Sequence, residues 1–211
     1  MPLAKIEKIN SNSFWCLFEI TESVDQLKKK VMLSEDGIAE LESISHPEKQ
    51  RERLASRCCV QELVKKAGKK YQGITKDEHE KPHLIGLNYH ISISHSYPYA
   101  AAILHKKLPV GIDIEKPVEK IGRIAHRFLN DAEFTDCDGD IKKLCIFWAG
   151  KESIFKLNGK KGLNFKRDIH IQNFVLHDKD VIRSEFLVEN ERVRIALNYL
   201  DYKSHIICYC F

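Results

Sequence analysis

Two acidic residues, Asp113 and Glu115, stand two positions apart in the apolar run PVGIDIE at 109–115. Alternate side chains of a β-strand share a face, so both carboxylates point away from Ile112 and Ile114, toward the side that we expect to lack a core. Paired hard oxygen ligands are what Mg²⁺ prefers. The pair predicts either a metal site or, if no further ligand joins it, ordinary solvated charge.

A second set of chemically capable residues falls in 141–158, where the apolar spacing predicts a helix. Glu152 and Lys156 are four apart and therefore neighbours, with Trp148 one turn earlier and Lys151 beside them. One interpretation is an exposed Glu–Lys helix pair. The other makes Glu152 a third metal oxygen and the two lysines phosphate donors.

A glycine inside this helix favours the second interpretation. Gly150 costs a helix interior roughly 1 kcal/mol relative to alanine. We therefore expect something to pack closely at that position.

The third candidate is the segment ISISHS at 91–96, where Ser94, His95 and Ser96 end a predicted strand. A single histidine is more often structural than catalytic. Serine hydroxyls, an imidazole and loop amides together nevertheless make a reasonable phosphate cradle.

The residues that must position these side chains show the period of two of a β-strand in some segments and the 3.6-residue period of an α-helix in others. This mixture predicts an α+β fold with a boundary near Leu108. Short β-like runs are separated by polar turns, and those at 89–94, 99–105 and 109–115 predict an antiparallel meander. Residues 71–88 have the composition of an exposed connection. Further strands are expected at 13–20 and in the runs IHIQNFVL, SEFLVE, VRIALNYL and HIICYCF, and helices near 33–44, 54–64, 119–134 and 141–158.

Composition excludes several classes of protein. The chain has 211 residues, of which 30% are charged and 43% hydrophobic, as is ordinary for a globular protein. The net charge of +4 is spread along the chain, which argues against a nucleic-acid partner and fits a phosphate-bearing small molecule or an acidic protein. No apolar run approaches the ~20 residues of a membrane span, no signal peptide is evident, and the seven cysteines lack zinc spacing, so we expect a cytoplasmic protein with reduced thiols.

The motifs ISISHS, VGIDIE and FWAGKESIFKLNG, in this order and spacing, closely resemble the Sfp-type 4′-phosphopantetheinyl transferases. The resemblance covers about 70 central residues, and Lys81-Pro82 and SHPEKQRER also look like the family's N-terminal lobe. Two departures are Ser153, where alanine is common, and one extra residue in NGKKGL.

The resemblance implies two similar α/β lobes related by a pseudo-twofold, 1–108 on the coenzyme A side and 109–211 carrying GIDIE and WAGKES, with coenzyme A and Mg²⁺ in the cleft between them. By position, it implies roles that fall into three groups. The magnesium ligands would be Asp113, Glu115 and Glu152; the pyrophosphate would be held by Lys151 and Lys156; the 3′-phosphate and adenine side would be held by Ser94, His95, Lys81, Arg51 and Arg57.

The activity implied is transfer of the phosphopantetheine arm of coenzyme A to a serine of an apo acyl or peptidyl carrier protein, by a monomer. Glu152 would be the base that accepts the serine proton, with Glu115 as the second choice. Lys156 and the metal would neutralise the charge that develops on the leaving phosphate. Two alternatives remain, a metal-dependent phosphohydrolase and a non-catalytic carrier-binding module. The sequence does not distinguish carriers of fatty-acid, polyketide or non-ribosomal peptide synthesis.

Overall fold

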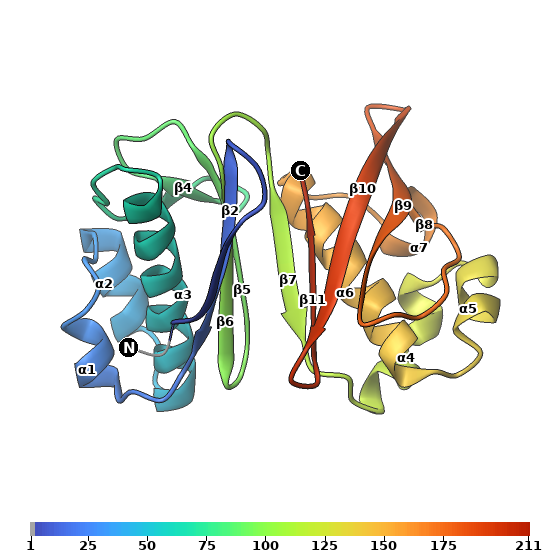
Figure 1. Ribbon diagram of the computed structural model, residues 1–211, viewed down its shortest axis with the longest axis horizontal. Helices are drawn as coiled ribbons and strands as arrows, with labels where there is room; N and C mark the ends of the chain where they lie inside the picture. The colour runs from blue at the N-terminus through green and yellow to red at the C-terminus, as the bar shows by residue number, and fades with distance from the viewer. Residues whose placement is uncertain (1–2) are drawn as a thin grey trace. The chain divides into compact units, whose positions relative to one another are not determined.

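The computed structural model describes residues 3–211, so residues 1 and 2, at the start of the predicted N-terminal lobe, lie outside the described residues. The chain divides into two compact units, one that ends at Val110 and one that is Gly111–Phe211 (Figure 1). Each unit consists of an antiparallel sheet and packed helices. The α+β prediction is therefore confirmed.

In the first unit the strands follow the order β1-β2-β6-β5-β4-β3, and neighbouring strands are antiparallel. Figure 1 shows the helices of this unit on one face of the sheet. The elements are β1 (Leu3–Lys8), β2 (Ser13–Glu19), α1 (Val24–Lys28), α2 (Glu35–Glu42), α3 (Pro47–Lys66), β3 (Ile74–Lys76), β4 (Pro82–Leu84), β5 (His90–Ser96) and β6 (Tyr99–His105).

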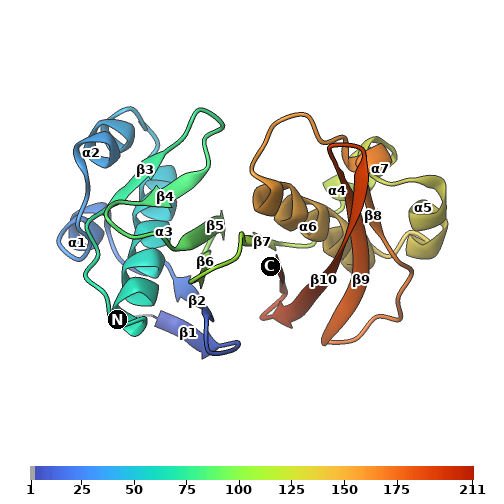
Figure 2. The same ribbon diagram turned by 90° about the horizontal axis from the view of Figure 1, so that it is seen from above.

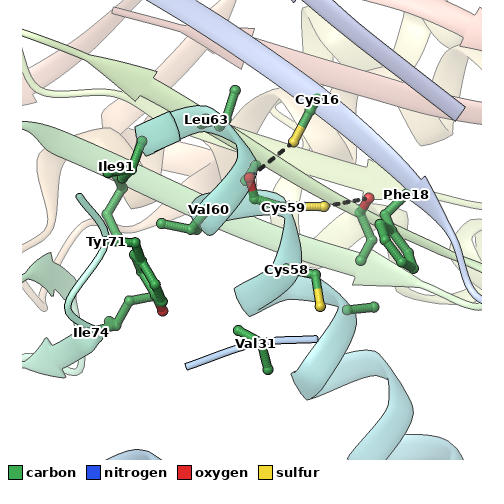
Figure 3. Close-up of a cluster of buried hydrophobic side chains, with 14 of the residues drawn as sticks. Cys16, Phe18, Val31, Cys58, Cys59, Val60, Leu63, Tyr71, Ile74 and Ile91 are labelled. Atoms are coloured by element: carbon green, nitrogen blue, oxygen red, sulfur yellow. Dashed lines mark hydrogen bonds between the residues drawn. The ribbon is translucent and has the colours of Figure 1, made fainter. Parts of the chain in front are cut away.

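The core of this unit forms where α3 packs on β2, β5 and β6 (Figure 3). Pro47 starts α3 at a position where its missing N–H costs nothing. Two buried thiols add weak hydrogen bonds, Cys16 Sγ to the Cys59 carbonyl and Cys59 Sγ to the Ala100 carbonyl, each at 3.4 Å. Burial raises the pKa of the Cys59 thiol, so this thiol remains protonated and unreactive.

In the second unit the strand order is β7-β11-β10-β9-β8, again antiparallel. The helix α6 packs on β7 and β11, and α4 and α5 pack on α6 (Figure 2). The elements are β7 (Gly111–Glu115), α4 (Lys120–Phe128), α5 (Asp131–Cys137), α6 (Ile141–Asn158), α7 (Phe165–Asp168), β8 (Ile169–Ile171), β9 (Lys179–Val188), β10 (Glu191–Tyr202) and β11 (His205–Cys210).

Three expectations about elements need correction. The meander holds for β5 and β6, but β7 pairs with β11 in the other sheet. Two short strands, β3 and β4, occupy part of the presumed connection at 71–88. The helix expected over 119–134 is broken, because Asn130 caps a new helix by accepting from the Glu133 amide while the Glu133 carboxylate accepts from the Asn130 amide.

No helix within residues 3–211 has both the length and the apolar composition that crossing a membrane requires. All seven cysteines are free and buried.

Candidate functional site

The carboxylates of Asp113 and Glu115 face α6, not an open side of the sheet. They share a face of β7 with Gly111, and a Cβ added at Gly111 would lie 1.8 Å from the Ser153 carbonyl oxygen in α6. Only glycine lets the helix approach this closely. The expectation of an uncored side was therefore wrong, and Asp113 is only 3% exposed.

Helix α6 supplies the partners of both carboxylates. Lys156 Nζ lies 2.6 Å from Asp113 Oδ1 and 3.3 Å from the Ile112 carbonyl oxygen. Trp148 Nε1 donates to Glu115 Oε1 at 3.3 Å. The indole is fixed by aromatic neighbours, with the ring of Phe128 at 5.1 Å and that of Phe165 at 5.7 Å between centroids.

The acidic residues of β7 and α6 also interact through their charges. Burial, followed by the charge of the Asp113 carboxylate, raises the pKa of Glu115 to about 7, even though the Trp148 hydrogen bond and Lys156 oppose the shift. Burial also raises the pKa of Glu152, again with a contribution from Asp113 and opposition from Lys156. Lys156 is thus the cation that offsets the repulsion among these three carboxylates.

Lys151, expected to hold pyrophosphate, lies in the interior of the second unit. Its side chain is 0% exposed, and Nζ donates to Glu133 Oε2 at 2.7 Å and to the carbonyls of Phe165 and Ile169 at 2.8 and 2.7 Å. Burial lowers the pKa of this ammonium and the Glu133 carboxylate opposes that shift. An ammonium has three N–H bonds, and all three have protein acceptors here.

Gly150 has the close neighbours that its place in the helix predicted. A Cβ there would lie 2.5 Å from Leu197 Cδ2 and 2.9 Å from Ile171 Cδ1. The prediction of close packing is confirmed, but the packed groups are side chains of the sheet. Gly150 therefore fixes how deeply α6 sits on the sheet.

Ser153, noted as a departure from the family pattern, also joins α6 to the sheet. Its hydroxyl lies 2.8 Å from the carbonyl oxygens of both Ala149 and Cys208. Sequence reasoning gave no role to two other positioning residues, Glu133 and Gly111. The signal for Gly111 was present in the GIDIE motif, whereas Glu133 lies far from Lys151 along the chain.

In the first unit, His95 on β5 contacts a residue of α3, and Arg51 on α3 contacts the residue that directly follows β5. His95 Nδ1 is 3.4 Å from Glu52 Oε2, and the Arg51 guanidinium lies 5.3 Å from the centre of the Tyr97 ring. These contacts join the end of β5 to the first half of α3. Ser94 is buried on the opposite face of β5 from His95, because adjacent strand residues alternate, so the two side chains do not share one face.

The remaining basic candidates of the first unit lie in other places. Arg57 is buried and forms an ion pair with Glu40, which also binds Arg53 and Lys76. Lys81 follows the turn before β4, where its amide donates to Asp77 Oδ1 at 3.0 Å. Burial lowers the pKa of the Lys81 ammonium.

The metal expectation rests on donor chemistry. Within residues 3–211, no three His, Cys, Asp or Glu side chains are placed closely enough to hold a metal ion as they stand. Burial and the nearby Asp113 carboxylate raise the pKa of Glu115 and of Glu152. These three carboxylates are, however, hard oxygen donors whose repulsion a divalent cation would relieve. The chemistry of the donor set therefore fits Mg²⁺.

Residues 109–210, which contain this carboxylate and lysine site, match the family model of the 4′-phosphopantetheinyl transferase superfamily. This part of the chain is therefore similar to the members of that superfamily. The chain is also similar to a 4′-phosphopantetheinyl transferase of Bacillus subtilis, with 35% identity over 97 residues. That alignment covers 43% of this chain and 42% of the relative, so the chain matches less than half of the relative's length.

Proposed function

We propose that this protein transfers the 4′-phosphopantetheine group of coenzyme A to a serine of an apo acyl or peptidyl carrier protein. The observation that carries the proposal is the convergence of Asp113, Glu115, Glu152 and Lys156 within the segment that matches the superfamily. The presence of two compact units in one chain supports an Sfp-type enzyme.

Asp113, Glu115 and Glu152 would hold Mg²⁺, which supplies charge neutralisation of the pyrophosphate when bound. Lys156, which already donates to Asp113 Oδ1, would share this role and donate to a phosphate oxygen. Trp148 would keep the Glu115 carboxylate in place through its indole N–H. Lys151 would act by fixing α6, since its ammonium is already engaged by three protein acceptors.

The carrier serine Oγ would attack the β-phosphorus of coenzyme A, and the bond from that phosphorus to the bridging oxygen would break. Adenosine 3′,5′-bisphosphate leaves with the bridging oxygen and its electron pair. Glu152 would accept the serine proton, with Glu115 as the second candidate. A raised pKa brings a carboxylate closer to the range in which it accepts protons near neutral pH, and burial raises the pKa of both residues.

Residues of the first unit would bind the nucleotide end of coenzyme A. Arg51 and His95 are placed at neighbouring ends of α3 and β5, which supports a shared role in holding the 3′-phosphate. Ser94 and Lys81 are proposed as further phosphate donors. Arg57 is the weakest candidate, because Glu40 already engages its buried guanidinium.

Intact-mass spectrometry of an apo carrier protein incubated with this protein, coenzyme A and Mg²⁺ tests the proposal. We expect a mass gain of one phosphopantetheine arm, lost with EDTA and strongly slowed in Glu152→Gln. Glu191→Gln, which changes an exposed carboxylate, is the matched control and should retain full activity.

The same assay separates the alternatives. Consumption of coenzyme A without any carrier modification would replace the proposal with the phosphohydrolase. If several unrelated apo carriers bind but coenzyme A stays intact, the protein is a carrier-binding module. A Glu115→Gln variant that is slower than Glu152→Gln, with both folded, would move the role of base to Glu115.

A further inference from the structure

A hollow of about 760 Å³ lies in the second unit, away from the carboxylate cluster. It is formed along β8, β9 and β10, which lie side by side (Figure 1), together with the start of α5. Its lining is mixed, with more apolar than polar surface, and includes Asn130, His170, Gln172, Arg183, Arg194 and Ala196. None of the proposed catalytic residues contributes to it.

The strand register places two arginines on the same face of the sheet. Arg183 pairs with Ala196, and Arg194 pairs with Glu185, so the two arginines are diagonal neighbours on adjacent strands. Diagonal positions are roughly 7–8 Å apart, which lets two long side chains reach one ligand. The single methyl group of Ala196 leaves open space beside Arg183.

The Glu185 carboxylate stands opposite Arg194 in the strand register, but Arg192 already engages it. The guanidinium of Arg192 lies 2.7 Å from Glu185 Oε1 and 3.2 Å from His170 Nδ1. The Glu133 carboxylate, at the edge of the hollow, is paired with Lys151. Within the part of the chain that the structure describes, neither Arg183 nor Arg194 has an ion-pair or hydrogen-bond partner for its side chain.

We propose that this hollow binds a phosphate-bearing small molecule of about nucleotide size. The planar guanidinium fork matches phosphate oxygens, and two such groups at fixed positions on paired strands are preorganised for a dianion. The volume is within the ~300–1,000 Å³ of small-molecule sites, and the amides of Asn130 and Gln172 suit hydroxyl groups. A protein partner would instead need a face of about 800 Å² on this side.

The test uses the full chain, labelled with ¹⁵N and titrated at constant ionic strength with inorganic phosphate and, separately, with adenosine 5′-monophosphate. We expect both probes to shift the amide signals of residues 170, 183 and 194, and the nucleotide to bind more tightly. In Arg183→Gln/Arg194→Gln these shifts should require at least about tenfold more probe, because two charge-assisted contacts are lost. Lys69→Gln/Lys161→Gln removes the same charge from exposed positions elsewhere and should change nothing.

Equal affinities for the two double variants would overturn the proposal, as would probe-induced shifts confined to the first unit or to residues around Asp113. A hexaglutamate peptide serves as a third probe. If it shifts these signals while both phosphate compounds fail to, the site binds an acidic peptide and the small-molecule assignment is wrong. The outcome does not depend on the transferase activity, because the titrations contain neither coenzyme A nor a carrier.

Discussion

Lys151 and Lys156 have the same side chain on the same helix, yet the structure gives them different environments. Positions five apart on an α-helix differ by about 140° around its axis, so the two lysines cannot serve one ligand from the same side. Glu152 and Lys156 differ by only about 40°. The motif alone does not distinguish these roles, and the distinction comes from Glu133 and the two carbonyls that surround Lys151.

We expect Lys151→Met to lower the free energy of unfolding by about 3–5 kcal/mol, because it leaves the Glu133 carboxylate buried without its cation. Urea denaturation measures this loss. The double variant Lys151→Met/Glu133→Gln should recover part of it, since no buried charge then lacks a partner.

The same variants test the role of Lys151 in the reaction. At a temperature where they are folded, the KM for coenzyme A should remain within about threefold of the wild type. A rise of tenfold or more in KM with folding intact would mean that Lys151 contacts the pyrophosphate after all.

The turn before Lys81 is held by the Asp77 carboxylate, which accepts from His83 Nε2 at 2.8 Å and from the amides of His79 and Lys81 at 2.9 and 3.0 Å. The hydrogen bond from His83 and the amide donors lower the pKa of Asp77 to about 2, from an ordinary value of 3.8. The folded-state pKa lies below the unfolded value, so this carboxylate stabilises the turn above about pH 4. That contribution is lost as the pH falls from 3.8 toward 2.

We expect a carbon-detected NMR titration to find the Asp77 pKa near 2 and to find it shifted upward, toward 3.8, in His83→Ala. His79→Ala is the matched control, because His79 reaches Asp77 only through its backbone amide, which the substitution keeps. An Asp77 pKa that His83→Ala leaves unchanged would show that the amides alone hold the carboxylate.

Among the elements, the contact between α6 and β7 determines the geometry of the site. In Gly111→Ala the new Cβ would meet the Ser153 carbonyl oxygen at 1.8 Å, and neither backbone can yield without moving α6 or β7. We expect a loss of at least about 1–3 kcal/mol in unfolding free energy and a lower kcat, because Glu152 and Lys156 move away from Asp113.

Gly122→Ala in α4 is the control for this substitution. Its Cβ would have no neighbour closer than 3.9 Å, and alanine favours the helix by up to about 1 kcal/mol, so stability should be unchanged or slightly higher. Denaturation and the carrier-modification assay measure both effects. A Gly111→Ala variant with wild-type stability and kcat would show that the close approach of α6 to β7 is not required.

Local patterns predicted several elements well. The apolar spacing of 141–158 and the following Gly159 predicted α6 at its observed bounds, and Gly159 has the left-handed φ of 68° that favours glycine. Alternation predicted β5, and short apolar or amphipathic runs predicted β6 and β7. Local patterns did not predict which strands pair with each other, because β7 pairs with β11, almost a hundred residues later in the chain.

The candidate site was predictable only where its residues lie on a single strand or a single helix. Asp113, Glu115, Glu152 and Lys156 could be proposed from spacing on one strand and one helix, and the structure brings Lys156 and Asp113 into contact. The family resemblance implied that Ser94 and His95 hold one phosphate together, but adjacent residues of a strand place their side chains on opposite faces. Which face of a strand meets a helix depends on packing between distant segments, as the burial of Asp113 against α6 shows.

At the scale of the whole molecule, the proposed function assigns the two ends of coenzyme A to different units, the 3′-phosphate to the first and the pyrophosphate to the second. Dephospho-coenzyme A lacks only the 3′-phosphate, so it tests this division directly. If His95 contacts that phosphate, His95→Ala should lower kcat/KM about tenfold to a hundredfold with coenzyme A but leave it nearly unchanged with dephospho-coenzyme A. Lys156→Ala should lower kcat/KM by the same factor with both substrates, because both keep the pyrophosphate.

This pattern separates contact from general damage. A variant that is merely misfolded or weakly active loses the same factor with either substrate, whereas a residue that touches the missing group loses its effect when the group is absent. Equal losses for His95→Ala with the two substrates would remove His95 from the 3′-phosphate site and leave its contact with Glu52 as its role, the joining of β5 to α3. Unequal losses for Lys156→Ala would place Lys156 near the 3′-phosphate and contradict the proposed division between the units.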